Sequence, residues 1–432
     1  MKSLHLVLLS CVMVACSEAA TANATNIFNV RDYGAKGDGQ AFDTDAIQKA
    51  LDACGAAGGG TVKLPAGTYL SKPITLSTKT TFLLEEGATL LASTNQQDFM
   101  KTPGDWLQAK GSGEFIPLVG GKNLTDVTIT GKGTIDGSGA VWWGEAEKAR
   151  QRVSGFTLPR PGLVVLTHCF NVRLSGIKLL NSPKFHFVPS DCDGVLVDGV
   201  TIIAPEGAAN TDGIDPMACY NVKITHCLID VGDDNIAIKA GRAKVPGHDY
   251  VSENIEVTDC TFLHGHGLSI GSEVVGGLRG LTVKNCSFSG TDNGIRIKSR
   301  RSLGGVVQDA TYTDIRMTNV LTPISIAAYY QDSSQSKFPT NDVAQEMTNG
   351  TPIFRNITIK NLTATATKDA GLIIGLPESA VTNVVLDNVH ITSTGNGFTI
   401  ANANGIQLKN SSVVAKNGKP YNLFNAQVDG LP

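Results

Sequence analysis

The chain has 432 residues, of which 17% are charged, 41% are hydrophobic and 47 are glycine. Few charges and many glycines suit a turn-rich β protein and exclude a disordered chain. A formal net charge of −3 provides no field that would attract a nucleic acid or an anionic membrane surface, so we expect neither as a partner. An anionic substrate would therefore need a local basic cluster.

Residues 1–24 are typical of an export signal peptide. Lys2 precedes an apolar run that is too short to span a bilayer as a helix. The small residues of Ala22-Asn23-Ala24 predict cleavage there and secretion, whereas the stretch ending at Cys16 loosely resembles a lipoprotein box and leaves a lipid anchor as the alternative. No other run is apolar and long enough to cross a membrane. Residues 25–432 are predicted to form a single domain, expected to be a monomer.

One amphipathic helix is predicted near the N-terminus. Asp43 or Thr44 can cap a helix that runs through Cys54, and Gly55 can end it. Its apolar face is expected to comprise Ala46, Ile47, Ala50, Leu51 and Cys54. Such a helix before a long β chain can cover the apolar end of a solenoid.

A short motif recurs from about residue 81 onward. It consists of Asn or Gly followed by an apolar-polar-apolar run, with successive starts at 171, 194, 221, 254 and 280, 23 to 33 residues apart. This period, without an interior helix pattern, predicts an all-β fold, a single-stranded right-handed parallel β-helix. The recurring Asn is expected to form a hydrogen-bonded ladder at one turn. Residues 98–160 and 331–355 break the rhythm and are expected to wall a groove, with a helix or loop over 145–152.

Seven cysteines lie outside the signal region, without CxxC or zinc-finger spacing. One or two disulfides remain open in an oxidising compartment. Cys227, Cys260 and Cys286 recur at the same place in the repeat, which favours stacking as small core residues.

Four short signatures fall on consecutive repeats. Each leads into a β-like run, and aligning these runs places Ile214, Ile236, Leu268 and Ile295 in one column. The signatures are Asn210-Thr211-Asp212-Gly213, Gly232-Asp233-Asp234-Asn235, Gly265-His266-Gly267 and Arg296-Ile297-Lys298.

Stacked at the strand spacing of roughly 4.8 Å, these signatures bring Asp212, Asp233, Asp234 and His266 together. Clustered carboxylates raise at least one pKa, and a carboxylic acid beside a carboxylate is what glycoside hydrolysis requires. Arg296 and Lys298 alternate along one strand, face the same side, and suit a sugar carboxylate. Each signature alone is more often turn or surface chemistry, but four in register indicate cleavage of a uronic-acid polymer.

Other readings of this cluster stay open. Calcium binding by the aspartates is an alternative that the histidine and the basic pair disfavour. Four further polar residues of these runs can either support the cluster or play stacking and turn roles: Asp215, Lys239, Ser269 and Glu273.

In order and spacing, the four signatures resemble those of the polygalacturonases, glycoside hydrolase family 28, and most of all its bacterial endo-acting members. Residues 30–39 and 133–139 match as well, so the resemblance covers nearly the whole mature chain. It implies an inverting hydrolase of polygalacturonate, the de-esterified form of pectin, that needs no metal or other cofactor.

The resemblance also implies a role for each residue. Asp233 would be the general acid, Asp212 and Asp234 would hold and deprotonate the attacking water, and His266 would tune the acid. Substrate binding would fall to Asn210, Arg296, Lys298 and Tyr330, where the adjacent Tyr329 makes the last assignment less secure. Alternatives are an exo-acting polygalacturonase, a rhamnogalacturonan hydrolase, a calcium-dependent pectate lyase, and a non-catalytic carbohydrate-binding β-helix.

Overall fold

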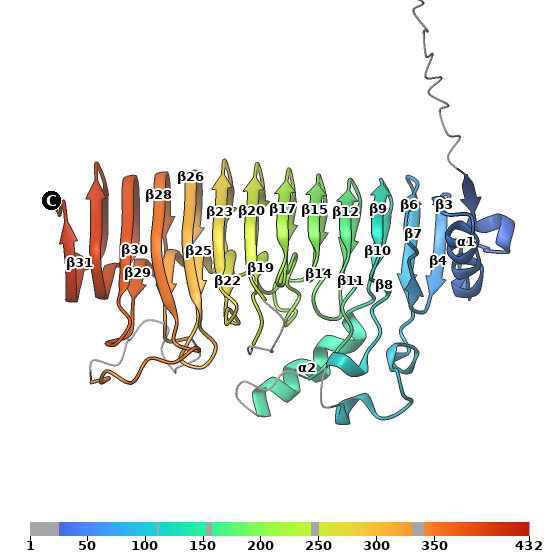
Figure 1. The fold of residues 1–432 in the computed structure, drawn as a ribbon, viewed down its shortest axis with the longest axis horizontal. Coiled ribbons are helices and arrows are strands. Elements are labelled where there is room, and N and C mark those ends of the chain that lie inside the picture. Colours follow the sequence, from blue (N-terminus) through green and yellow to red (C-terminus); the bar gives the residue numbers. More distant parts are fainter. Residues whose placement is uncertain (1–25, 110–111, 153–157, 243–249, 331–340, 432) are drawn as a thin grey trace, which may run out of the picture.

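The computed structural model describes residues 26–109, 112–152, 158–242, 250–330 and 341–431, and its strands coil into one long solenoid (Figure 1). All pairings between its strands are parallel, within one 27-stranded and one four-stranded sheet. The predicted all-β, right-handed parallel β-helix is confirmed. In this described part, no helix has the length and apolar character to cross a membrane. The predicted signal peptide lies outside the described residues.

Each coil contributes strands to three stacks. The first stack contains β1 (Ile27–Asn29), β3 (Gly60–Leu64), β6 (Thr80–Leu84), β9 (Thr125–Gly131), β12 (Phe170–Ser175), β15 (Asp193–Asp198), β17 (Tyr220–Thr225), β20 (Ser252–Thr258) and β23 (Leu278–Lys284). The second contains β2 (Asp38–Phe42), β4 (Gly67–Ser71), β7 (Ala88–Ala92), β10 (Thr134–Asp136), β13 (Lys178–Leu180), β16 (Thr201–Ile203), β18 (Leu228–Asp230), β21 (Thr261–Phe262) and β24 (Ser287–Ser289).

The third stack carries the signatures. It contains β5 (Ile74–Thr75), β8 (Val119–Lys122), β11 (Val164–Thr167), β14 (Phe187–Ser190), β19 (Ile236–Ile238), β22 (Leu268–Gly271), β25 (Asn293–Lys298), β27 (Thr322–Ala327) and β29 (Asp369–Ile374). Four longer strands bend around the later coils and serve more than one stack: β26 (Val306–Val320), β28 (Ile353–Ala366), β30 (Val381–Lys409) and β31 (Ser412–Asp429).

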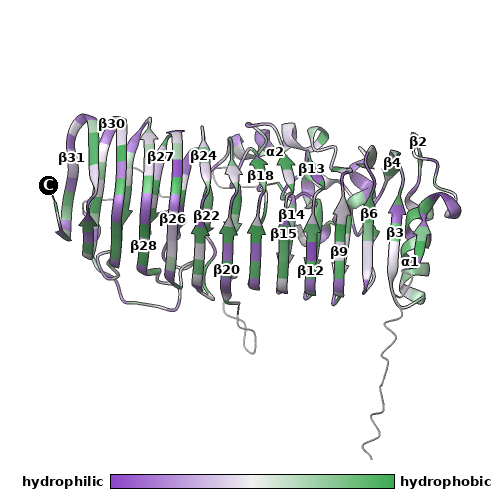
Figure 2. Cartoon of the chain, turned by 90° about the horizontal axis from the view of Figure 1, so that it is seen from above, coloured by the Kyte–Doolittle hydropathy of each residue, from purple (hydrophilic) through white to green (hydrophobic). Residues whose placement is uncertain are grey.

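The hydrophobic core is one continuous cluster from Val30 to Leu408. Hydrophobic and hydrophilic residues alternate along many strands, as expected where one face of each strand is buried (Figure 2). The predicted column is confirmed, because Ile214 pairs with Ile236, Ile236 with Leu268, and Leu268 with Ile295.

The predicted N-terminal helix is α1 (Thr44–Ala56), and its five predicted apolar residues are all buried. It covers the first coils at one end of the solenoid (Figure 1). The predicted end at Gly55 is wrong, because the helix continues to Ala56 and turns at Gly58, where φ is +81°. Gly55 serves packing instead, since a Cβ there would lie 2.8 Å from the Ser77 hydroxyl oxygen.

Asn side chains form the predicted ladder at one turn. Asn171, Asn221 and Asn254 adopt φ values of +55°, +54° and +57°, and Gly194 and Gly280 take the same turn with positive φ. The Asn254 amide donates to the side chain of Asn221 at 2.6 Å, so neighbouring rungs satisfy each other.

All seven cysteines of the described residues are buried free thiols, so the disulfides left open by the sequence are not formed. Cys227, Cys260 and Cys286 precede residues that pair across β18, β21 and β24, which confirms their predicted stacking. A second set, Cys169, Cys192 and Cys219, stacks in the same way and was not predicted.

Within the predicted excursion over 98–160, the stretches before β8 and after β10 form a lobe with α2 (Ala140–Arg152) outside the solenoid (Figure 1). The prediction is wrong for β8, β9 and β10, which lie in the same range but remain in the three stacks. Trp142 anchors the lobe, since its buried ring contacts Phe99, Trp106 and Phe115 edge-on. Four short 3-10 helices complete the fold: η1 (Val30–Tyr33), η2 (Gln96–Phe99), η3 (Trp106–Gln108) and η4 (Ser112–Glu114).

Candidate active site

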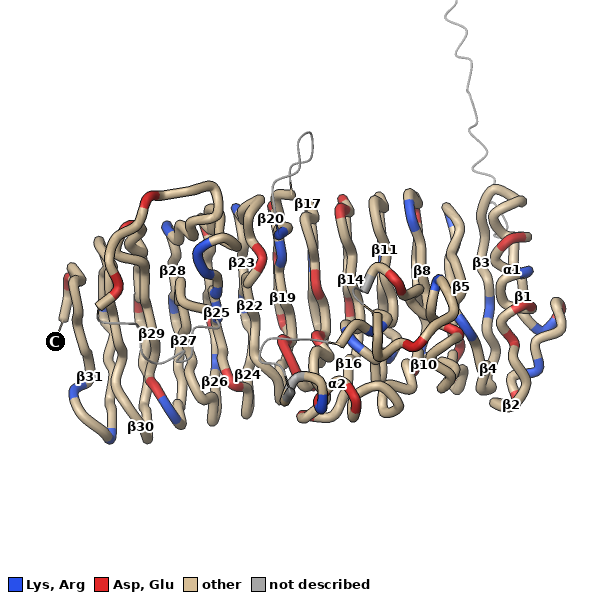
Figure 3. The backbone as a smooth tube through the Cα atoms, turned by 90° about the horizontal axis from the view of Figure 1, so that it is seen from below, with Lys and Arg blue, Asp and Glu red and all other residues tan. Residues whose placement is uncertain are grey.

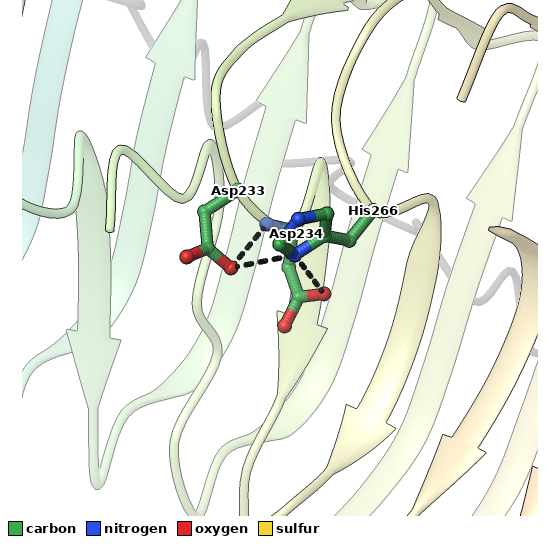
Figure 4. Close-up of side chains that lie close together, drawn as sticks. All are labelled: Asp233, Asp234 and His266. Carbon is green, nitrogen blue, oxygen red and sulfur yellow. Dashed lines mark hydrogen bonds and ion pairs between the residues drawn. The ribbon is translucent and has the colours of Figure 1, made fainter. Parts of the chain in front are cut away.

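The four signatures lie on consecutive rungs of the third stack. Asp212 precedes the bridge at Ile214, Asp233 and Asp234 precede β19, and His266 precedes β22. Figure 4 shows that Asp233, Asp234 and His266 converge although 33 residues separate the first from the last. The local turn determines the backbone conformation at each residue, and the pairing of strands between successive coils brings their side chains together.

These residues line a cleft of about 330 Å³. Of the eight predicted site residues, six line it directly: Asn210, Asp212, Asp233, Asp234, Lys298 and Tyr330. His266 and Arg296 contact these residues from the side. Tyr330 lines the cleft, whereas the adjacent Tyr329 is buried and donates its hydroxyl to Asp342 at 2.6 Å.

Asp234 is buried and fully engaged. One of its oxygens accepts from the Ser269 hydroxyl at 2.7 Å and from Arg296 at 3.2 Å, and the other accepts from Lys298 Nζ at 2.5 Å. Burial alone would raise the pKa of Asp234, but the charges of Lys298 and Arg296 outweigh it and lower this pKa. Asp234 is thus held ionised, and the basic pair predicted for a sugar carboxylate already contacts a carboxylate of the protein.

Asp233 and His266 form the second pair, with Nδ1 of the imidazole 3.1 Å from Asp233 Oδ1. Oδ1 also accepts the Asp234 backbone N–H at 2.9 Å. Burial opposes both charged forms, yet the pKa of Asp233 is lowered because His266 and Lys298 favour the carboxylate. The pKa of His266 is raised because Asp233 and Asp234 outweigh burial, so the proton of the pair lies on the imidazole in the free protein.

Asp212 differs from both. Its side chain is 3% exposed, and its Oδ1 has no hydrogen-bond partner among the described residues. Burial, together with the charges of Asp215 and Asp233, raises its pKa well above the usual range. The imidazole of His186 fixes the backbone, with Nδ1 3.1 Å from the Asp212 carbonyl oxygen, and burial lowers the pKa of His186 to about 4.

Arg160 completes the centre and was not found from the sequence. It is 1% exposed, and its Nη2 donates to the Ala209 carbonyl at 3.1 Å and to the Asn210 Oδ1 at 3.0 Å. The Asn210 amide nitrogen in turn lies 3.4 Å from Asp233 Oδ2. Because guanidinium is only a donor, it fixes which end of the Asn210 amide faces Asp233.

Comparisons with known proteins show the family of this chain. Residues 54–414 match the family described as glycosyl hydrolases family 28. The chain belongs to this family. It is 36% identical to an endo-polygalacturonase of Pectobacterium carotovorum subsp. carotovorum, over 81% of this chain and 84% of the relative.

Solved structures of this family share the fold. A polygalacturonase from Erwinia carotovora ssp. carotovora is 32% identical with a TM-score of 0.69, over 89% of this chain and 94% of that one. A family 28 exopolygalacturonase from Yersinia enterocolitica superposes with a TM-score of 0.78 at 24% identity, over 94% and 79% of the two chains.

The cleft of this family 28 hydrolase is rimmed by basic residues outside the signatures. Lys184, Lys239, Arg242 and Arg300 line it together with Lys298. Burial and the nearby Arg160 lower the pKa of Lys184 to about 8. Of these residues, the sequence singled out only Lys239 and Lys298, because the others lie in connections without a repeat pattern.

The weaker predictions find supporting roles. Ser269 donates to Asp234, as described, whereas Lys239 lies between Asp215 and Glu273, at 3.7 and 3.8 Å. Lys239 and Arg242 outweigh the burial of Glu273 and lower its pKa to about 2. Asp215, Lys239, Glu273 and Arg242 thus form a second charged network beside the aspartates. Figure 3 shows acidic and basic positions on the neighbouring coils from β14 to β25.

Asp233, Asp234 and His266 are close enough to be weighed as metal ligands. Their atoms are already engaged, since Asp234 accepts from two cations and both His266 nitrogens face carboxylates, at 3.1 and 3.2 Å. Calcium prefers oxygen ligands without competing cations, so this donor set fits it poorly.

A second hollow, of about 430 Å³, lies outside the cleft, beside Arg279, Gln308 and Arg355. Its lining contains no Asp, Glu or His, so it offers no group for acid–base chemistry at neutral pH. The aspartates of the signatures line the smaller cleft instead.

Proposed function

We propose that this glycosyl hydrolase cleaves α-1,4-galacturonosyl linkages of de-esterified polygalacturonate, in the interior of the polymer and with inversion. The observation that carries the proposal is the stack of three aspartates and a histidine in a cleft rimmed by five Lys and Arg residues. Carboxylic groups suit glycosidic cleavage, and the basic rim suits a polymer that carries one carboxylate per sugar. The endo-polygalacturonase that is 36% identical supports both substrate and mode.

Asp233 is proposed as the general acid. Its proton rests on His266 in the free protein, so it has to move from Nδ1 to the carboxyl before the glycosidic oxygen is protonated. Loss of water on substrate binding favours this transfer, because it raises the pKa of the carboxyl group and lowers that of the imidazolium, and the transfer leaves both groups neutral. Asn210, which accepts a hydrogen bond from Arg160, contacts Asp233 Oδ2 from the other side.

Asp234 and Asp212 are proposed to hold and deprotonate the attacking water. Arg296 and Lys298 keep Asp234 ionised, which suits a base. Lys298 also lines the cleft, and its ammonium lies 5.1 Å from the centre of the Tyr330 ring, so both can meet a sugar carboxylate at one end of the site.

A second assignment rests on one specific observation. Burial and the charges of Asp215 and Asp233 raise the pKa of Asp212 well above the usual range, which favours its protonated form in the free protein. In this version Asp212 donates the proton and Asp233 assists the water. A substrate with a good leaving group separates the two, because only the variant that lacks the acid keeps its activity on such a substrate.

The experiment uses the purified full chain and de-esterified polygalacturonate. We expect new reducing ends, a ladder of oligomers, no unsaturated uronide, and activity that survives a chelator. Monomer as sole product would indicate exo attack, chelator-sensitive unsaturated product a lyase, and binding without turnover a carbohydrate-binding protein. Secretion, the lipid anchor at Cys16, the single domain over 25–432 and the monomeric state stay predictions.

A further inference from the structure

His266 has a second carboxylate neighbour, which the signatures do not include. Its Nε2 lies 3.2 Å from Asp292 Oδ2, while its Nδ1 faces Asp233. The imidazole is thus held between two carboxylates, one that lines the cleft and one outside its lining. The side chain of Asp292 is 49% exposed, compared with 14% for Asp233.

The backbone keeps Asp292 in this place. Its N–H donates to the Gly265 carbonyl at 2.7 Å, and its carbonyl accepts from Thr322 N–H at 3.0 Å. Gly265 immediately precedes His266, so these backbone hydrogen bonds between neighbouring rungs place Asp292 beside His266. Asp292 also stands directly before β25, which carries Arg296 and Lys298.

We propose that Asp292 is a positioning residue for the reaction, an anionic partner that holds the His266 ring with Nδ1 toward Asp233 and stabilises its protonated form. An imidazole whose Nε2–H is bound by a carboxylate cannot rotate or exchange its two nitrogens without losing that bond. Asp292 stabilises the imidazolium that holds the proton until Nδ1 passes it to Asp233, and after Asp233 has given that proton to the leaving oxygen the neutral ring keeps its Nε2–H on Asp292, so Nδ1 stays toward Asp233. This inference rests on the proposed function.

The charged groups around His266 determine in which direction its pKa should change when Asp292 is replaced. Asp233 and Asp234 face it from the turn before β19, Asp292 faces it from the turn before β25, and Arg296 opposes them from β25. Removing the charge of Asp292 takes away one group that favours the imidazolium. The pKa of His266 must then fall, and activity that requires the imidazolium must be lost at a lower pH.

The chain contains a matched control. His264 and Asp230 lie on the same two rungs as His266 and Asp233, and His264 Nδ1 is 2.9 Å from Asp230 Oδ1. The side chain of His264 is 51% exposed, compared with 28% for His266. An Asp–His contact thus also occurs away from Asp233. Asp230→Asn removes the carboxylate of that contact and measures the effect of such a loss on activity where the histidine does not contact Asp233.

The experiment measures kcat/KM on de-esterified polygalacturonate as a function of pH for the wild type, Asp292→Asn and Asp230→Asn. Asn keeps an acceptor for Nε2–H but removes the charge. We expect the alkaline limb of Asp292→Asn to move down by about 0.5–1 pH unit, a modest shift because Asp292 is half exposed, with the acid plateau within about twofold of the wild type. Asp230→Asn should follow the wild-type profile. Titration of the histidines by NMR should give the same downward shift for His266.

Two results would overturn the inference: an Asp292→Asn profile that superimposes on the wild type, or an equal shift in Asp230→Asn. Asp292→Ala adds a second readout, since it removes the acceptor as well and should lower kcat more than Asp292→Asn at the plateau. Equal plateaus for these two variants would contradict a positioning role. An inactive wild type would instead refute the proposed function, and the NMR titration would still test the contact.

Discussion

Asn210 at the site and the asparagines of the ladder share one backbone conformation but differ in what their side chains contact. Asn210 has φ of +54°, as does Asn221, and Asn254 has +57°. In the ladder, Asn254 donates to the equivalent Asn221, and the chain reaches the same turn elsewhere with glycine. At the site, Asn210 accepts from Arg160 and reaches Asp233, neither of which is an asparagine.

The difference teaches what distinguishes a functional stack from a structural one. A ladder of Asn and Asp residues on neighbouring turns satisfies itself, since Asn254 donates to Asn221 and Asn221 donates to Asp193, and each rung adds a similar small increment to stability. The site stacks unlike residues, leaves Asp212 Oδ1 without a partner among the described residues, and shifts the pKa values of Asp212 and Asp233 in opposite directions. Such opposed shifts are a feature of acid–base catalysis.

Replacing Asp233 should have the largest effect on activity. Asp233→Asn should lower kcat on polygalacturonate by about 10²–10⁴-fold, because an amide can neither give nor take the proton. Stability should change little, since one of several clustered negative charges is lost. Reducing-end assays and thermal unfolding measure the two effects.

A substrate with an activated leaving group sharpens the assignment. If Asp233 is the acid, Asp233→Asn should keep most of its activity on an activated aryl galacturonide, whereas Asp212→Asn should lose activity on both substrates. The reverse pattern would assign the acid to Asp212, and equal losses in both variants would contradict either division of labour.

Much of this arrangement could be predicted because it is periodic. The Asn or Gly start of each repeat fixed the register, and the register placed Asp212, Asp233, Asp234 and His266 on one wall. Arg160 could not be predicted, because it lies in the connection between β10 and β11, which follows no repeat. The end of α1 was missed for a similar reason, since the role of Gly55 depends on a contact with the distant Ser77.

Replacing Arg160 tests whether this residue orients the Asn210 amide for substrate binding. Arg160→Met should lower kcat/KM by about 10- to 100-fold, because it removes a charge-assisted hydrogen bond worth about 1.5–3 kcal/mol and frees the Asn210 amide to turn. The main effect should fall on KM, since Asn210 is proposed to bind substrate. Steady-state kinetics measure both constants.

Arg160→Lys is the matched variant. It keeps the positive charge near Asp233 and Asp212 but loses the planar fork that reaches both Ala209 and Asn210. We expect a value between those of the wild type and Arg160→Met. Full activity of the Lys variant would mean that charge alone matters and that the amide is oriented by other groups.

Asp215 tests the buried charge of the site through stability rather than activity. Burial raises its pKa from 3.8 to about 7, so the folded protein binds more protons than the unfolded chain between these values. Stability should therefore rise as pH falls from about 7 toward 4. Asp215→Asn should flatten this part of the profile, and thermal unfolding between pH 4 and 8 measures it. A profile parallel to the wild type would show that Asp215 is ionised at neutral pH by its contact with Lys239.

The ladder should give the smallest effect, and one confined to stability. Asn254→Gly keeps the positive φ but loses the bond to Asn221, at a cost of about 0.5–1 kcal/mol because the bond is exposed. Asn254→Ala loses the bond and must also hold the left-handed conformation, which adds about 1 kcal/mol. Urea unfolding should rank wild type, Gly and Ala in that order, with kcat unchanged in both variants. If either variant lowered kcat, the ladder would be coupled to the site, and the separation between self-satisfied and catalytic stacks would fail.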